Sequence, residues 1–220
     1  MDIVFFVFEI IGIISFALSG AMLAIRKEMD VLGVCVMGAV TAVGGGITRD
    51  LLLGITPPTF LTDPTATLVA ICTSILIFLP FSQRFLKKTS QRVYDTLMLV
   101  ADSIGLGIFT VMGVNICLQN AESPTLFMCV FLGVITGVGG GVLRDILSQS
   151  KPYIFVKHFY ATASLIGALL YALLHPVLRE LPATLLSFGV IVTLRLLAAK
   201  FRWKLPKYIQ SDSASDKKQK

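Results

Sequence analysis

The chain has 220 residues, of which 55% are hydrophobic and only 15% are charged. Soluble domains carry about 25% charged residues, so this composition excludes an ordinary soluble domain and indicates a polytopic membrane protein. The net charge of +6 does not point to nucleic acid as a partner, because the basic residues of a membrane protein set its orientation. The sequence has no Walker motif, nucleophile elbow, HExxH motif or zinc-type cysteine spacing, so we expect no catalysis and no cofactor.

Seven apolar segments follow one another along the chain, joined by short polar links. A membrane-spanning helix needs about 20 mostly apolar residues. The candidate spans are residues 3–25, 31–53, 64–81, 93–118, 124–147, 157–177 and 181–199. The first segment lacks a basic leader and a small-residue cleavage site, so it is expected to stay as a span. We therefore predict an all-α membrane protein with seven transmembrane helices.

The links between these spans differ in charge. Taken alternately, one group of links and the C-terminal tail hold fifteen Lys and Arg residues, whereas the other group holds only Arg179. Basic residues concentrate on the cytoplasmic side of membrane proteins. This bias places the N-terminus outside and the C-terminus in the cytoplasm, as expected for a protein of the bacterial inner membrane with an odd number of spans.

A repeat relates the two halves of the chain. Residues 38–53, GAVTAVGGGITRDLLL, align without gaps to residues 133–148, GVITGVGGGVLRDILS, and nine of the sixteen positions are identical. Upstream, residues 9–21 match residues 102–114 at an offset of 93, which pairs Glu9 with Asp102. The repeat unit contains three spans, and because three is odd the second copy enters the membrane from the opposite side. Inverted repeats of this kind are common in transport proteins.

The repeat divides the chain into four parts. Residues 1–92 form the first three-helix unit, and residues 93–178 form the second, inverted unit. Residues 179–200 form the seventh transmembrane helix. Residues 201–220 form a basic cytoplasmic tail that is expected to be partly disordered.

The glycine triplets Gly44, Gly45, Gly46 and Gly139, Gly140, Gly141 lie inside apolar spans. Glycine weakens a helix, so we expect each triplet to bend or break its span and to lie along an ion path. In that hypothesis the freed carbonyls of Gly44, Gly45, Gly139 and Gly140 coordinate a monovalent cation. The alternative is close packing, because small residues let membrane helices approach one another.

Charged residues accompany both triplets. At 1.5 Å per residue, the first triplet lies roughly 21 Å into its span, and Glu9 lies at a similar level in the neighbouring span. We therefore expect Glu9 to face Arg49 and, in the second repeat, Asp102 to face Arg144. These residues are either pore-lining groups or salt bridges that brace the bundle, and the arginines are candidates for a barrier in the path.

The remaining charges inside the spans receive simpler interpretations. Asp50 and Asp145 follow the two arginines, and each is expected to share its arginine or to cap backbone N–H groups. Arg195 lies near the cytoplasmic end of the last span, where its long side chain can extend toward the interface.

The paired GGGxxRD motifs, the FALSGA of the first span, the LGIFTVMGV of the fourth and the prolines after both motifs resemble one family. It is the bacterial trimeric intracellular cation channel (TRIC) family, whose repeat is also known as a glycine transporter domain. The resemblance covers residues 3–199. It implies a homotrimer in which each subunit has its own potassium-permeable pore, lined by kinked second and fifth helices that carry Gly44–Gly46, Arg49, Asp50, Gly139–Gly141, Arg144 and Asp145.

Two other functions remain compatible with the residues. Carbonyls and carboxylates could hold an ammonium group and helix N-termini a carboxylate, so a carrier for glycine or a similar zwitterion is the main alternative. A non-conducting trimeric scaffold is the third hypothesis. It has little support, because the sequence contains no large soluble domain that could bind partner proteins. The expected partners are potassium or other monovalent cations, membrane lipids and further copies of the chain, with no nucleic acid.

Overall fold

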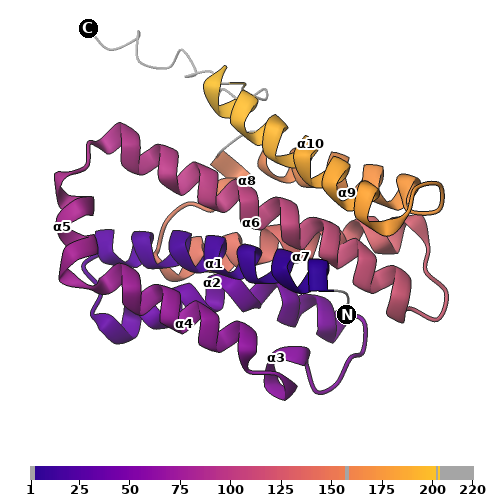
Figure 1. The fold of residues 1–220 in the computed structure, drawn as a ribbon, viewed down its shortest axis with the longest axis horizontal. Helices are drawn as coiled ribbons and strands as arrows, with labels where there is room; N and C mark the ends of the chain where they lie inside the picture. The colour runs from indigo at the N-terminus through magenta and orange to yellow at the C-terminus, as the bar shows by residue number, and fades with distance from the viewer. Residues whose placement is uncertain (1–2, 157–158, 202, 204–220) are drawn as a thin grey trace, which may run out of the picture.

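The structure is a computed structural model, and it describes residues 3–156, 159–201 and 203. Within these ranges the secondary structure is entirely helical, as Figure 1 shows. The helices are α1 (Ile3–Arg26), α2 (Val31–Leu52), α3 (Thr59–Thr62), α4 (Thr65–Phe78), α5 (Pro80–Lys88), α6 (Gln91–Asn120), α7 (Leu126–Leu147), α8 (Tyr153–Val156), α9 (Tyr160–Leu174) and α10 (Glu180–Lys200).

Each of the seven predicted spans overlaps one of the longer helices over most of its length. Five of them, α1, α2, α6, α7 and α10, are long and apolar enough to cross a membrane. The other two are shorter than the roughly 20 residues of a full span, with 14 residues in α4 and 15 in α9. The all-α membrane fold is therefore confirmed, whereas the count of seven complete spans stays a prediction.

The helices form one bundle of two related halves (Figure 1). In the first half α1 packs against α2 and α4, and in the second half α6 packs against α7 and α9. The halves meet where α2 contacts α7 and where α1 contacts α6, and α10 covers α6 and α9. Helix α5 lies at one end of the bundle, which we call the α5 end, and the first residues of α1 lie toward the opposite end, the α3 end.

The two halves also share local structure at equivalent positions. The side chain of Asp30 accepts a hydrogen bond from the Gly33 amide at the start of α2, and that of Thr125 accepts one from the Met128 amide at the start of α7. Such caps satisfy N–H groups that have no partner within the helix. Asp30 and Thr125 are 95 residues apart, which is the offset of the sequence repeat. The repeat in the amino-acid sequence is thus also a repeat of helix start positions in the structure.

The chain turns away after α2 and after α7 through left-handed residues. Gly54 has a φ of 72° and Gln149 has a φ of 53°, again at the offset of 95. Left-handed residues commonly end helices. The short helices α3 and α8 follow these turns and lead into α4 and α9. Of the expected basic tail, only Phe201 and Trp203 lie within the described residues.

Candidate functional site

The two glycine triplets lie at the contact between α2 and α7. A Cβ atom built on Gly45 would overlap the carbonyl oxygen of Thr136, and one built on Gly140 would overlap the carbonyl oxygen of Thr41. Backbone atoms cannot move aside as a flexible side chain can. The middle glycine of each triplet is therefore required for the close approach of the two halves.

The triplets do not break their helices, whereas the expected bend stays a prediction. Helix α2 runs without interruption from Val31 to Leu52, and α7 from Leu126 to Leu147, so both triplets are helical. In an apolar medium the helical hydrogen bonds outweigh the low helix propensity of glycine, because an unpaired backbone group is expensive there. Because the helices are continuous, no broken turn frees the carbonyls of Gly44, Gly45, Gly139 and Gly140, and the cation site on them stays a prediction.

The third glycine of each triplet faces a charged group. The nearest atom to a Cβ built on Gly46 is Nη2 of Arg49, at 3.7 Å. A Cβ on Gly141 would lie 2.6 Å from the hydroxyl oxygen of Tyr160 and 3.6 Å from Oδ1 of Asp102. These glycines thus provide room for two charged sites, one in each half of the protein.

The first charged site lines a cavity of about 310 Å³ near the α3 end, which we call the α3 cavity. Its charged lining consists of Glu9 from α1, Arg49 and Asp50 from α2, and Asp63 from the link before α4. Three carboxyl groups thus share the wall with one guanidinium group. The rest of the lining is mostly apolar and includes Phe109.

Arg49 forms its ion pair with the neighbouring Asp50, whose Oδ1 accepts hydrogen bonds from Nε at 2.9 Å and Nη2 at 2.7 Å. The other oxygen of Asp50 accepts the amide N–H of Thr59 at the start of α3. No ion pair joins Glu9 to Arg49 in the described part of the chain, although both line the α3 cavity. The predicted contact is therefore a shared cavity and not a salt bridge.

Asp63 keeps its charge at the edge of the α3 cavity. Hydrogen bonds from the side chain and the amide of Thr65 lower the pKa of Asp63 below its usual value. The Asp63 carboxylate is consequently ionised across the physiological pH range, which makes this end of the cavity attractive to cations.

The second charged site is a buried cluster of Asp102, Arg144, Asp145 and Arg195, which we call the Arg144 cluster. Nη1 of Arg144 donates to Oδ1 of Asp102 at 2.7 Å, and Nε donates to Oδ1 of Asp145 at 3.0 Å. The side chains of Arg144 and Asp102 are completely buried. The predicted pairing of Asp102 with Arg144 is therefore present in the structure.

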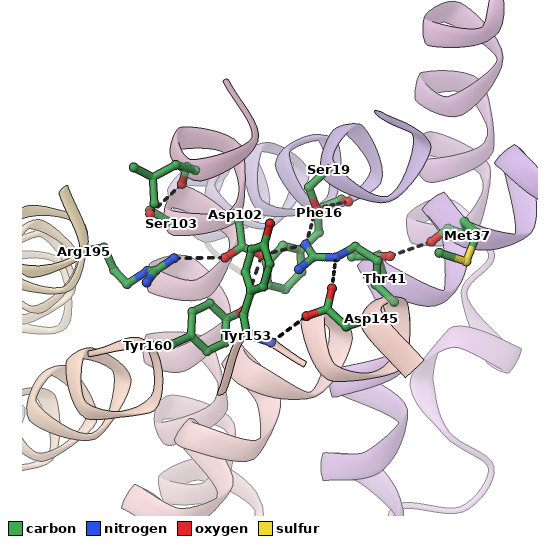
Figure 2. A network of polar contacts seen from close by, with 12 residues as sticks. Phe16, Ser19, Met37, Thr41, Asp102, Ser103, Asp145, Tyr153, Tyr160 and Arg195 are labelled. Carbon is green, nitrogen blue, oxygen red and sulfur yellow. Dashed lines mark hydrogen bonds and ion pairs between the residues drawn. The ribbon is translucent and has the colours of Figure 1, made fainter. Parts of the chain in front are cut away.

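Neighbouring groups complete the cluster, as Figure 2 shows. Ser19 of α1 accepts a second hydrogen bond from Nη1 of Arg144 at 3.0 Å. Asp145 also accepts the amide N–H of Tyr153 at 2.8 Å, so Asp145, like Asp50, both pairs with its arginine and caps a short helix. Tyr160 donates to Asp102 at 3.5 Å. With two arginines and two aspartates, the four charges balance.

Arg195 is the residue whose role the sequence interpretation missed. It does not extend to the interface but is buried, and its Nη2 lies 3.5 Å from Oδ2 of Asp102. Its guanidinium also covers the ring of Tyr160 at 4.6 Å. A signal was present in the sequence, because Arg195 continues a helical stripe of small and buried positions that includes Ser187 and Ile191.

Two stacked aromatic rings lie between the charged sites. The rings of Phe16 and Phe109 are 5.2 Å apart with an interplanar angle of 29°. Phe109 lines the α3 cavity, and the carbonyl of Phe16 accepts a hydrogen bond from Ser19, which contacts Arg144. Phe16 and Phe109 are equivalent positions of the repeat. The aromatic pair thus connects the α3 cavity to the Arg144 cluster.

This chain is similar in sequence to a known protein family and to known membrane proteins. A family profile described as "Glycine transporter" matches residues 6–81 and 99–176, one segment in each half. The UPF0126 inner membrane protein YadS of Escherichia coli (strain K12) is 38% identical over 202 residues, which cover 91% of this chain and 94% of that protein.

Solved structures agree with the sequence matches. A TRIC cation channel, solved for the structural basis of its conductance, shares 41% identity with a TM-score of 0.82 and covers 95% of this chain and 100% of its own. The TRIC trimeric intracellular cation channel orthologue from Rhodobacter sphaeroides shares 30% identity with a TM-score of 0.83, covering 92% of this chain and 100% of its own.

Proposed function

The chain belongs to the glycine transporter family and has the fold of TRIC cation channels, and from this premise we propose that it is a potassium-permeable channel for monovalent cations. We further propose that it assembles as a homotrimer with one pore in each subunit, lined by α2 and α7. The R. sphaeroides orthologue is described as trimeric, which supports this assembly. The protein lies in the bacterial inner membrane, surrounded by lipid, with its N-terminus outside.

The α3 cavity is the observation that carries the proposal. It holds three carboxyl groups against one guanidinium, so it attracts cations and disfavours anions. Its acidic groups do not converge as a cage, since Asp50 is already engaged by Arg49 and Thr59. Divalent cations are held by several converging oxygen ligands, whereas conduction requires weak and transient binding. The negative potential of the α3 cavity therefore suits the weak, transient binding of a monovalent cation.

The Arg144 cluster is the barrier of the path in this conformation. It is neutral overall, and Arg144 and Asp102 have no exposed surface, so it fills its part of the bundle without leaving room for an ion. Passage of a cation requires the arginine side chains to move away from Asp102. In this proposal Arg144 both braces the second half and blocks the path, whereas Arg49 acts beside an open cavity.

Recording from purified protein in planar bilayers tests the proposal. Single-channel steps that carry potassium, reverse at the potassium equilibrium potential and exclude chloride are expected. Phe109→Trp enlarges a ring at the inner wall of the α3 cavity, so those trimers of this variant that fold should carry a lower unitary current. Absence of steps from folded wild-type trimers would contradict the channel.

A glycine carrier is the second candidate, and the name of the matching family favours it. Vesicles that contain the protein would then accumulate labelled glycine with saturable kinetics, and no unitary currents would appear. We expect the opposite pattern: potassium flux that does not saturate at millimolar concentrations and no competition by glycine.

A further inference from the structure

Two of the four cysteines face each other at the corner between α6 and α7. Cys117 lies in the last turn of α6, and Cys129 lies in the first turn of α7. Their sulfur atoms are 2.6 Å apart, and both side chains are buried. An S–S bond is about 2.05 Å long, so a shift of roughly half an ångström would join them. Cys35 and Cys72 are partly or fully exposed.

We propose that Cys117 and Cys129 form a disulfide that closes the α6–α7 corner. The charge bias of the links predicts that this corner lies on the outer side of the membrane, where disulfides form and persist. The inference rests on this orientation and on the geometry of the two sulfurs. It does not depend on whether the protein conducts ions.

The equivalent corner of the first half supports the dependence on compartment. The repeat offsets of 93 and 95 place Ala24 at the position of Cys117 and Val34 at the position of Cys129. Both residues are completely buried in one cluster at the α1–α2 corner. This corner is predicted to face the reducing cytoplasm, and there the same two positions hold apolar residues that cannot be oxidised.

The bond forms by thiol–disulfide exchange with a dithiol oxidase of the outer compartment, whose disulfide is the oxidant. The thiolate of one cysteine attacks this disulfide and forms a mixed disulfide, releasing one oxidase thiolate. The second cysteine thiolate then attacks the protein sulfur, and the oxidase leaves as a dithiol. Two protons and two electrons thus leave the cysteines, and the oxidase takes up both electrons. Because the finished fold covers both sulfurs, exchange occurs before the corner is fully packed.

Counting free thiols tests the proposal. The full chain is produced in a bacterium with an oxidising periplasm, the cells are quenched with acid, and the denatured protein is labelled with a polyethylene glycol maleimide. Two labels are expected without reductant and four after reduction, and peptide mapping should join α6 to α7. In cells that lack the periplasmic thiol oxidase, four labels are expected without reductant.

Two variants sharpen the count. Cys117→Ser should give three labels both with and without reductant, because Cys129 loses its partner. Ala24→Cys combined with Val34→Cys adds a matched pair at the cytoplasmic corner, and both new thiols should label without reductant. Four labels on the wild-type chain from oxidase-containing cells, or protection of Cys35 or Cys72 instead, would overturn the assignment. Oxidation of the matched pair would overturn the dependence on compartment.

Discussion

The two halves use the same Arg–Asp motif to build sites with different properties. In the first half Arg49 lines a cavity and, among the described residues, forms an ion pair with its neighbour Asp50 alone. In the second half Arg144 is completely buried and pairs with Asp102 as well as Asp145. The motif itself therefore does not determine whether a site is open or sealed. The residues that other helices bring to the arginine make the difference.

A comparison of the two halves shows three differences around the arginines. The carboxylate opposite the arginine is Glu9 in the first half and Asp102 in the second. The offset of 93 places Met112 where Ser19 would be, so Arg49 lacks the hydroxyl acceptor that Arg144 has. Arg195 comes from α10, which has no copy in the repeat. A symmetric pair of motifs thus becomes asymmetric through its surroundings.

The largest expected difference comes from removing each arginine. Arg144→Gln should lower the free energy of unfolding by about 3–5 kcal/mol, because it takes from two buried carboxylates, Asp102 and Asp145, the arginine that pairs with both. Arg49→Gln should lower it by less, about 1–3 kcal/mol, since Asp50 retains the Thr59 amide as a hydrogen-bond donor. Denaturant unfolding of both variants in the same detergent measures the contrast, and equal losses would contradict it.

The middle glycines should behave alike, because here the halves are symmetric. Gly45→Ala and Gly140→Ala each place a methyl group against a backbone carbonyl and should each destabilise the protein by about 1–3 kcal/mol. Gly189→Ala is the matched control, since a Cβ at that position of α10 has no neighbour within 4 Å. The control should be neutral or slightly stabilising in the same thermal unfolding experiment. Tolerance of both middle substitutions would mean that α2 and α7 do not pack as described.

Substitution of the third glycine in each triplet should again affect the two halves differently. The difference in stability should be smaller than the difference between the two arginine variants. Gly141→Ala pushes against the hydroxyl of Tyr160 and should destabilise the protein by about 1 kcal/mol. Gly46→Ala meets only Arg49, at 3.7 Å, and should change stability by less than about 0.5 kcal/mol. The comparison of the two unfolding midpoints tests the difference, and a larger effect at Gly46 would reverse our assignment of open and sealed sites.

The smallest expected effect concerns conduction through the α3 cavity. Glu9→Gln and Asp63→Asn should each lower unitary potassium conductance about twofold at low ionic strength, because each removes negative charge from the cavity wall. High salt should reduce the effect by screening. Glu122→Gln is the control, because Glu122 is exposed and outside the cavity lining. An equal loss in the control variant would contradict a local role of the cavity.

The sequence predicted some of these contacts because the repeat adds long-range information. Pairing Glu9 with Asp102 and Arg49 with Arg144 at matching depths led to the Asp102–Arg144 ion pair. For Glu9 and Arg49 the same argument predicted the shared level correctly but not the lack of an ion pair between them in the described residues. Depth along a helix fixes the level of a side chain but not the direction in which it points. Glu9 therefore shares a cavity with Arg49 without reaching it.

The two incorrect predictions have different physical causes. The glycine triplets were expected to bend or break α2 and α7, and the expectation of a break failed because propensity scales describe helices in water. In a packed apolar bundle the backbone keeps its helical hydrogen bonds, and the absence of side chains serves the contact at Gly45 and Gly140 instead. Arg195 was placed at the interface by its distance from the helix end. Its position on the buried face of α10 turned it inward, and a face analysis of that helix would have shown this.

The double role of Asp145 has a mechanical consequence. One oxygen of its carboxylate holds Arg144, and the other holds the amide of Tyr153 at the start of α8. The arginine cannot swing away unless it releases this carboxylate or draws the beginning of α8 along with it. Asp145 is therefore a linkage that converts a rotation of one side chain into a pull on the connection between α7 and α9, and Asp50 provides the same linkage between α2 and α4.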